Sequence, residues 1–140
     1  MPPRFDDRDA IKVDEDLWRR VLPLQECFQP IGAGQWRPSS AVFLDRRTGE
    51  VSVHVSLLTT VEGVLGAYPY HSLVGIKASV PRGLGHLVCP DPVKDDPEFP
   101  DDESHALICP PPGIGISRLK ANAKRMALQA TWVVLRNPPY

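Results

Sequence analysis

Two similar histidine–cysteine segments flank an acidic loop in the second half of the chain. The first contains His86 and Cys89, and the second contains His105 and Cys109. Their spacing, H-x2-C-x15-H-x3-C, is close to spacings that bind tetrahedral zinc through thiolates and imidazoles. The sequence therefore offers zinc, held by these four residues in a zinc-stabilised structural domain, as one hypothesis.

The geometry of a regular strand favours a different interpretation of these four residues. Side chains alternate along a strand, so His86 and Cys89 would point to opposite faces, whereas His105 and Cys109 would share a face but lie about 13 Å apart. The apolar residues within each segment are typical of strands. In this interpretation the cysteines are core residues, the histidines end strands, and no cofactor is needed.

A cysteine nucleophile is a second possible chemistry. It requires a thiolate beside an imidazole in a partly exposed, electropositive pocket. The best catalytic candidates are His105 and Cys109. Neither Cys89 nor Cys109 is expected to begin a helix, and the neighbouring acidic residues would raise a thiol pKa. A Cys/His-based enzyme is therefore an alternative, and a non-enzymatic function is favoured.

A glycine-bearing segment that enters a helix is a candidate anion-binding site. Free backbone N–H groups and the helix dipole attract anions at such a position. The residues expected to form the site are Gly113, Gly115, Ser117, Arg118 and Lys120. The segment matches neither the P-loop nor the dinucleotide fingerprint, so a turn with a serine cap is the competing interpretation.

Polar residues before an apolar run form a candidate pocket. Arg37, Ser39 and Ser40 could hold a phosphate or a nucleotide ribose. An arginine of the Trp18–Arg20 stretch, followed by this paired serine, also resembles the order of such residues in ADP-ribosyltransferases. A nucleotide-handling enzyme is therefore an alternative. No acidic motif completes that pattern, and a solvated loop is the competing interpretation.

The loop over residues 90–104 carries seven acidic residues, four prolines and one lysine. Such a loop is expected to be exposed and mobile. A basic protein partner would face the carboxylates of Asp95, Asp96, Asp101 and Asp102. The favoured function is therefore a binding or adaptor module that acts with a protein partner, as an accessory component of a bacterial multi-gene system.

Composition narrows the class of protein. The net charge of −1 argues against general electrostatic binding to nucleic acid. No apolar run approaches the length of a membrane span, and the first residues lack the apolar core of a signal peptide. Three cysteines are an odd number, which favours free thiols over disulfides and a cytoplasmic location.

The pattern of apolar residues predicts a disordered arm over residues 1–12 and a single α+β domain over residues 13–140. Strict alternation of Val51, Val53 and Val55 predicts a strand over 50–56, paired in a hairpin with 41–45. A strand is also expected over 73–80, a short helix over 60–66, and a short helix over 17–22, for which a strand is the alternative.

A helical stripe predicts the longest helix, over residues 117–135. The stripe consists of Leu119, Ala123, Met126, Ala127, Ala130 and Val134. We expect a mostly antiparallel sheet of four to six strands, covered by this long C-terminal helix.

Four short stretches occur in an order that resembles short uncharacterised bacterial proteins with an RPSSAVF…GEVSV…HAL pattern. They are Trp18–Arg20, Arg37–Phe43, Gly49–Val53 and Ser104–Leu107. The resemblance covers most of the chain after residue 14, and it implies no particular activity.

Overall fold

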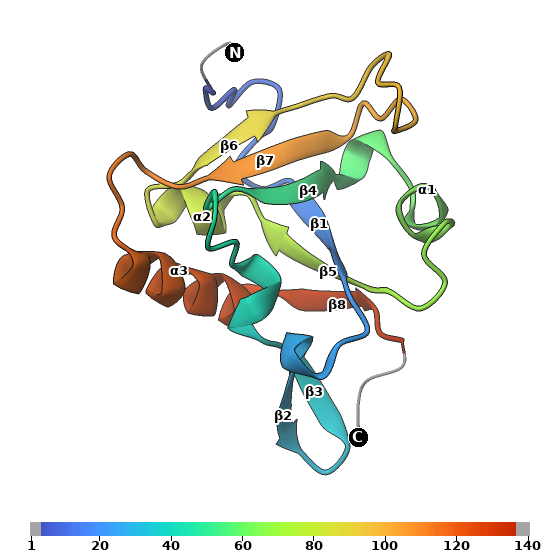
Figure 1. Ribbon diagram of the computed structural model, residues 1–140, viewed down its shortest axis with the longest axis vertical. Helices are drawn as coiled ribbons and strands as arrows, with labels where there is room; N and C mark the ends of the chain where they lie inside the picture. The colour runs from blue at the N-terminus through green and yellow to red at the C-terminus, as the bar shows by residue number, and fades with distance from the viewer. Residues whose placement is uncertain (1–3, 137–140) are drawn as a thin grey trace.

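The computed structural model describes residues 4–136 and has a six-stranded antiparallel sheet at its centre (Figure 1). The strand order is β6-β7-β4-β1-β5-β8. These strands are β1 (Asp16–Val21), β4 (Val51–Val55), β5 (Ser72–Lys77), β6 (Leu87–Pro90), β7 (His105–Cys109) and β8 (Thr131–Val134). A separate hairpin of β2 (Phe28–Gly32) and β3 (Gln35–Pro38) projects from one end of the molecule.

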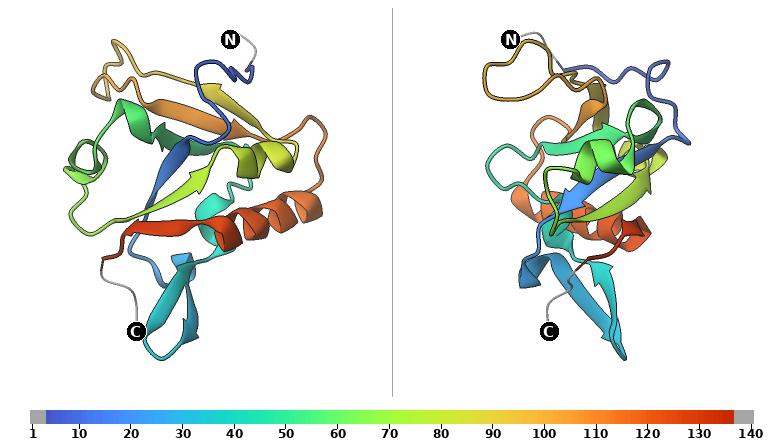
Figure 2. Two further views of the ribbon diagram at one scale, coloured as in Figure 1. Left: turned by 180° about the vertical axis from the view of Figure 1, so that it is seen from behind. Right: turned by 90° about the vertical axis from the view of Figure 1, so that its right-hand side faces the viewer.

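Three α-helices and three short 3-10 turns join the strands. The helices are α1 (Val61–Leu65), α2 (Ser79–Gly83) and α3 (Ile116–Gln129), and the turns are η1 (Gln25–Cys27), η2 (Ser40–Phe43) and η3 (Ser56–Leu58). Figure 2 shows α3 running along one side of the sheet. The α+β class is therefore confirmed, and six strands fall within the expected range.

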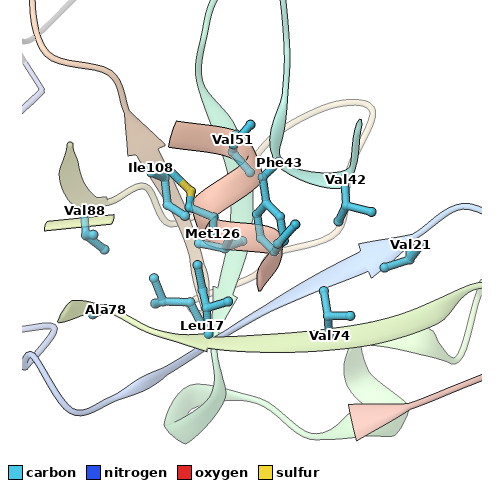
Figure 3. Close-up of a cluster of buried hydrophobic side chains, with 14 of the residues drawn as sticks. Leu17, Val21, Val42, Phe43, Val51, Val74, Ala78, Val88, Ile108 and Met126 are labelled. Carbon is cyan, nitrogen blue, oxygen red and sulfur yellow. The ribbon is translucent and has the colours of Figure 1, made fainter. Parts of the chain in front are cut away.

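The main core lies between one sheet face and the segments α3 and η2 (Figure 3). Val51 on β4 packs in the same buried cluster as Met126 on α3 and Phe43 on η2. Apolar residues three and four positions apart give α3 this buried face, and removal of their surface from water stabilises the fold. On the opposite face of the sheet, Val64 and Leu65 of α1 cover Leu73.

Several predicted elements have different boundaries or types. Residues 40–43 form η2 instead of a strand, and residues 16–21 form strand β1, which was the alternative to a helix. β5 ends at Lys77, and α2 follows it. The long helix ends at Gln129, so Ala130 and Val134 lie outside it, and it shares its sheet face with η2. A single long helix that covers the sheet is therefore not confirmed.

The segment expected to be a disordered arm is packed onto the domain over residues 4–11. The Ile11 side chain is only 2% exposed and belongs to the main core. Asp6 forms a buried ion pair with Arg82 of α2, with an N–O distance of 2.6 Å, and accepts a hydrogen bond from the Val88 backbone. Charge in this segment pairs with charge in the domain, so the segment is held in place. Residues 1–3 lie outside the described part of the chain.

Among residues 4–136, none of the helices combines the length and the apolar character that a membrane crossing requires.

Candidate functional site

Strand register brings two histidines together on the sheet face opposite the main core. His54 of β4 pairs directly with His105 of β7. Partners in an antiparallel pair project to the same face, and the two ring centroids lie 5.9 Å apart. Because Val53 and Val55 point into the core, the alternation of β4 directs His54 the other way.

His54 is hydrogen-bonded to the end of the acidic loop. Its Nδ1 lies 3.1 Å from Asp102 Oδ2 and 3.1 Å from the Ser104 hydroxyl. The Ser104 hydroxyl in turn donates to Asp102 Oδ1 at 2.6 Å. A carboxylate can only accept, so His54 Nδ1 carries the proton in this arrangement. Both polar partners therefore lie on one ring nitrogen, unlike the serine and aspartate of a catalytic triad.

The other nitrogen of His54 faces a cation. Arg20 Nη1 lies 3.4 Å from His54 Nε2, and a guanidinium group can only donate. His54 Nε2 is therefore an acceptor, and the ring is neutral. Burial lowers the pKa of His54, the carboxylate of Asp102 opposes this shift, and repulsion from Arg20 adds to it. The Arg20 guanidinium also lies 4.1 Å above the Tyr68 ring.

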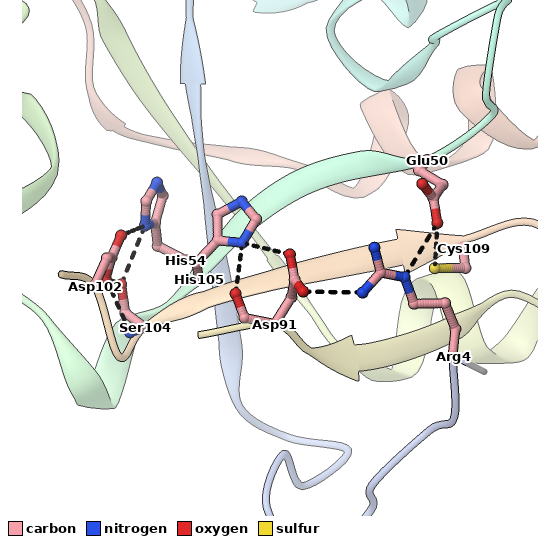
Figure 4. Close-up of polar contacts among 8 residues, drawn as sticks. All are labelled: Arg4, Glu50, His54, Asp91, Asp102, Ser104, His105 and Cys109. Atoms are coloured by element: carbon pink, nitrogen blue, oxygen red, sulfur yellow. Dashed lines mark hydrogen bonds and ion pairs between the residues drawn. The ribbon is translucent and has the colours of Figure 1, made fainter. Parts of the chain in front are cut away.

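His105 holds the beginning of the same loop. Its Nδ1 lies 2.9 Å from the Asp91 backbone carbonyl and 3.1 Å from Asp91 Oδ2. The second carboxylate oxygen of Asp91 accepts a hydrogen bond of 2.9 Å from Arg4. Figure 4 shows that the Nε2 atoms of His54 and His105 both lie on the side away from these carboxylates.

The two histidines therefore fix both ends of the acidic loop, which we define as residues 91–104. We call the five residues His54, Asp91, Asp102, Ser104 and His105 the histidine clamp. Just inside the clamp, the backbones of Val93 and Asp102 exchange hydrogen bonds of 2.9 and 2.8 Å. The base of the loop is thus a small ordered structure joined to β4 and β7.

The outer part of the loop is shaped by its own carboxylates. Asp96 Oδ1 accepts from the backbone N–H groups of Glu98 and Phe99, and Asp101 Oδ1 accepts from that of Asp95. The Phe99 side chain is 60% exposed. Five acidic residues are exposed there and make no ion pair with any group of residues 4–136: Asp95, Asp96, Glu98, Asp101 and Glu103.

The structure separates the residues expected to act in partner binding. Asp95, Asp96 and Asp101 lie on the exposed part of the loop, whereas Asp102 belongs to the histidine clamp. Asp102 therefore contributes to the shape of the loop. Although burial alone would raise the pKa of Asp102, the hydrogen bonds from Ser104 and the nearby imidazoles lower it.

The candidate nucleophile Cys109 is not paired with His105. Its thiol donates a 3.3 Å hydrogen bond to Glu50, at the far end of β7 from the imidazole. Burial raises the pKa of the Cys109 thiol, and the contacts with Glu50 and Cys89 raise it further. Burial also raises the pKa of Cys27 and Cys89. A neutral buried thiol is a poor nucleophile.

The four candidate zinc ligands do not converge. His86 is hydrogen-bonded to Asn122, and His105 to Asp91. Cys89 and Cys109 pack together with Leu107. Within residues 4–136, no three or more His, Cys, Asp or Glu side chains form a group that could hold a metal ion. The arrangement therefore gives the zinc hypothesis no support.

The candidate pocket residues lie at the end of β3 and at the beginning of η2. Arg37 pairs with Gln29 in the β2–β3 hairpin, the Ser39 hydroxyl donates to the Glu26 carbonyl, and Ser40 begins η2. None of the three lines the hollows between α2 and α3. The Ser39 hydroxyl instead ties η1 to η2.

The candidate anion-binding residues are spread along the approach to α3. Gly115 is the N-cap of the helix, and Ser117 lies inside its first turn without a capping hydrogen bond. Gly113 has a positive φ of 74° in the preceding turn. Of this set, only Arg118 lines a cleft, while Lys120 is exposed elsewhere on the helix.

Sequence reasoning missed His54, although one signal was present. Its place on the polar side of an alternating strand indicates that it leaves the core. Its partners Asp102 and Ser104 lie far away in the chain, and no local pattern connects them.

Comparisons of the chain with protein-family models, with curated proteins and with solved structures found no match.

Proposed function

We propose that the protein is a binding module that acts with a protein partner, and that the acidic loop contacts a basic segment of that partner. One observation carries the proposal: a loop fixed at both ends presents exposed carboxylates that have no ion-pair partner within residues 4–136. A fixed loop loses little conformational entropy when it binds. A cluster of negatively charged carboxylates raises the rate of encounter with a basic partner.

The exposed Phe99 ring extends this surface beyond simple charge attraction. A partner segment that combines lysine or arginine with an apolar side chain would contact both the carboxylates and this ring. Aromatic side chains often supply much of the energy at such interfaces. We include in the proposal that the protein acts in the cytoplasm, as an accessory component of a bacterial multi-gene system.

Charge neutralisation on the loop tests the proposal. The test variant combines Asp95→Asn, Glu98→Gln and Glu103→Gln, whose side chains make no hydrogen bond within the described structure. The matched control combines Asp9→Asn, Asp14→Asn and Glu26→Gln, which removes the same charge from exposed positions elsewhere. The probe is a synthetic lysine-rich peptide that contains one leucine, measured by calorimetry at several salt concentrations.

We expect the loop variant to bind this peptide about tenfold more weakly and with a smaller salt dependence. The control should bind like the unmodified protein. Equal losses in both variants would mean that only the net charge attracts the peptide, and would contradict a binding site on the loop.

The imidazole pair supports a second candidate, a nucleotide-handling enzyme that uses acid–base catalysis. Both Nε2 atoms lie on one side of the clamp, and Arg20 beside His54 could attract a phosphate. Two imidazoles in reach of one phosphoester can transfer protons to and from it. Hydrolysis of bis(4-nitrophenyl) phosphate that is lost in His105→Gln would support this candidate; no turnover above buffer would remove it.

A further inference from the structure

A cleft of about 480 Å³ lies between α2 and α3, away from the histidine clamp. Arg118, Asn122 and Arg125 of α3 line one wall, and the chain at the end of α2 lines the other. A second hollow of about 340 Å³ continues from it along Val80 and Leu128. The two share Gly83, Leu84 and Arg125, so a polar region adjoins an apolar one.

Both arginines of the cleft lack an acidic partner. No Asp or Glu occurs in residues 79–90 or 105–136, which include both walls. Among residues 4–136, neither Arg118 nor Arg125 takes part in an ion pair, whereas Arg82 of the neighbouring helix is paired with Asp6. The positive charge of the cleft is therefore available to an anion from outside.

Asn122 is a buried polar residue that faces this charge. It lines the cleft although its exposed fraction is only 5%. Its side-chain amide is 2.9 Å from His86 Nε2, and burial lowers the pKa of His86, which keeps that ring neutral. The amide atom that faces His86 is Nδ2, so the neutral imidazole accepts one of its two N–H groups at Nε2. The second N–H of Nδ2 is then left to donate to a ligand oxygen, with His86 as the positioning residue.

Two glycines keep the cleft open. A Cβ atom built on Gly83 or Gly85 would meet no atom within 4 Å. Gly85 has a φ of +86°, which favours glycine. Gly83 is the last residue of α2 and has no such requirement, and glycine is less favourable than alanine in a helix. Neither backbone conformation nor packing explains Gly83, but the open space beside it does.

We propose that the α2–α3 cleft binds a small organic phosphate. The phosphoryl group contacts Arg118, Asn122 and Arg125, and the rest of the ligand extends along Val80 and Leu84. Guanidinium groups match phosphate oxygens with paired N–H donors. Arg118 and Arg125 are two helical turns apart on one face, so their side chains reach the space between them from both ends. The site is independent of the acidic loop.

Titration of the 15N-labelled protein with three probes tests this site. The probes are inorganic phosphate, adenosine monophosphate and hexyl phosphate, so that a nucleotide and an alkyl phosphate are compared directly. We expect saturable binding of at least one organic phosphate, with a Kd below about 1 mM, and chemical shift changes at the backbone amides of Gly83, Leu84 and Gly85. Inorganic phosphate should bind about tenfold more weakly, because it lacks contacts in the apolar hollow.

Two variants and one control complete the test. Arg118→Gln with Arg125→Gln should weaken binding about tenfold or more, and Gly83→Leu should weaken it similarly by filling the cleft. Lys120→Gln with Lys124→Gln removes the same charge from the same helix outside the cleft and should leave the affinity unchanged. Circular dichroism confirms that each variant is folded.

Three outcomes would overturn the proposal: no saturable binding of either organic phosphate, equal binding of inorganic phosphate, or equal losses in the arginine and lysine variants.

Discussion

The histidine clamp contains the buried His54, and the buried His86 lies behind Asn122, a lining residue of the α2–α3 cleft. Both imidazoles are neutral, but the two regions differ in how their charges are compensated. In the clamp, the N–H of His54 meets the carboxylate of Asp102, and that of His105 meets Asp91. Behind the cleft, the His86 side chain is hydrogen-bonded only to the Asn122 amide, and its Nδ1 has no partner within the described residues. Paired polar groups hold the chain in place, whereas unpaired charge in a hollow leaves interactions for a ligand.

Arg82 gives the sharpest test of this contrast, because it belongs to α2 beside the cleft and yet is paired. Asp6→Ala would leave the buried Arg82 guanidinium without a counter-charge. We expect the free energy of unfolding, measured with urea, to fall by about 3–5 kcal/mol. In the control Asp16→Ala, the exposed ion pair with Lys77 is lost, and the change should stay within about 1 kcal/mol. Equal small changes would mean that the N-terminal segment is as loose as its sequence suggests.

A strand can be predicted from the sequence where it has one polar face and one apolar face. The alternation of Val51, Val53 and Val55 places β4 correctly. Alternation does not identify β1, because Arg19 occupies a position on the core face between Leu17 and Val21. The Arg19 guanidinium donates to the backbone carbonyls of Val42 and Ser52. An arginine on the core face is tolerated only with such acceptors, and nothing local in the sequence reveals them.

The turn η2 was missed for a related reason. Its run of apolar residues, Ala41 to Leu44, has no alternation, and a short apolar run does not distinguish a strand from a helical turn. Contacts with α3 decide its form.

The candidate site is predicted only in part. The acidic loop and His105 can be identified from the sequence, but the pairing of Asp102 with His54 depends on strand register. Long-range register therefore sets the limit of prediction for both fold and site.

Removal of one clamp histidine tests whether the clamp holds the acidic loop. In His54→Ala, the Asp102 carboxylate and Ser104 hydroxyl lose a buried partner. We expect a loss of about 1–3 kcal/mol in the free energy of unfolding and faster amide hydrogen exchange at Val93 and Asp102. Ser52→Ala, an exposed change on the same strand, is the control. A destabilisation without faster exchange in the loop would show that His54 supports the sheet and not the loop.

The dependence of stability on pH tests the other histidine. Burial lowers the pKa of His86 in the folded protein. As the pH falls, His86 is therefore protonated in the unfolded chain at a higher pH than in the folded protein. The contribution of neutral His86 is therefore complete above the ordinary histidine pKa of about 6.5 and is lost below it. We expect the free energy of unfolding to decrease from pH 7.5 to 5.5, by at most about 1.4 kcal/mol per pH unit for this group.

The variant His86→Gln isolates that contribution, because glutamine keeps a polar contact with Asn122 but does not titrate. Its stability should change less between pH 7.5 and 5.5 than that of the unmodified protein. An identical pH dependence in both would mean that His86 already titrates normally, and that the buried side of the cleft is wetter than its geometry indicates.

The smallest expected effect separates the two glycines of the cleft. Both Gly83 and Gly85 have room for a Cβ atom, and they differ in backbone conformation. Gly83→Ala should therefore raise the free energy of unfolding by about 0.5–1 kcal/mol, since alanine restricts the unfolded chain and suits a helix. Gly85→Ala should lower it by about 1 kcal/mol or more, because its φ of +86° is strained for any other residue. Thermal and urea denaturation measure both.

If Gly83→Ala is destabilising instead, the glycine is needed for the backbone conformation of α2, and the open space beside Gly83 no longer indicates a ligand site. A gain in stability would mean that the natural glycine stabilises the fold less than alanine does, at a position where the cleft needs space. Such a residue is expected at a site that is kept open for binding.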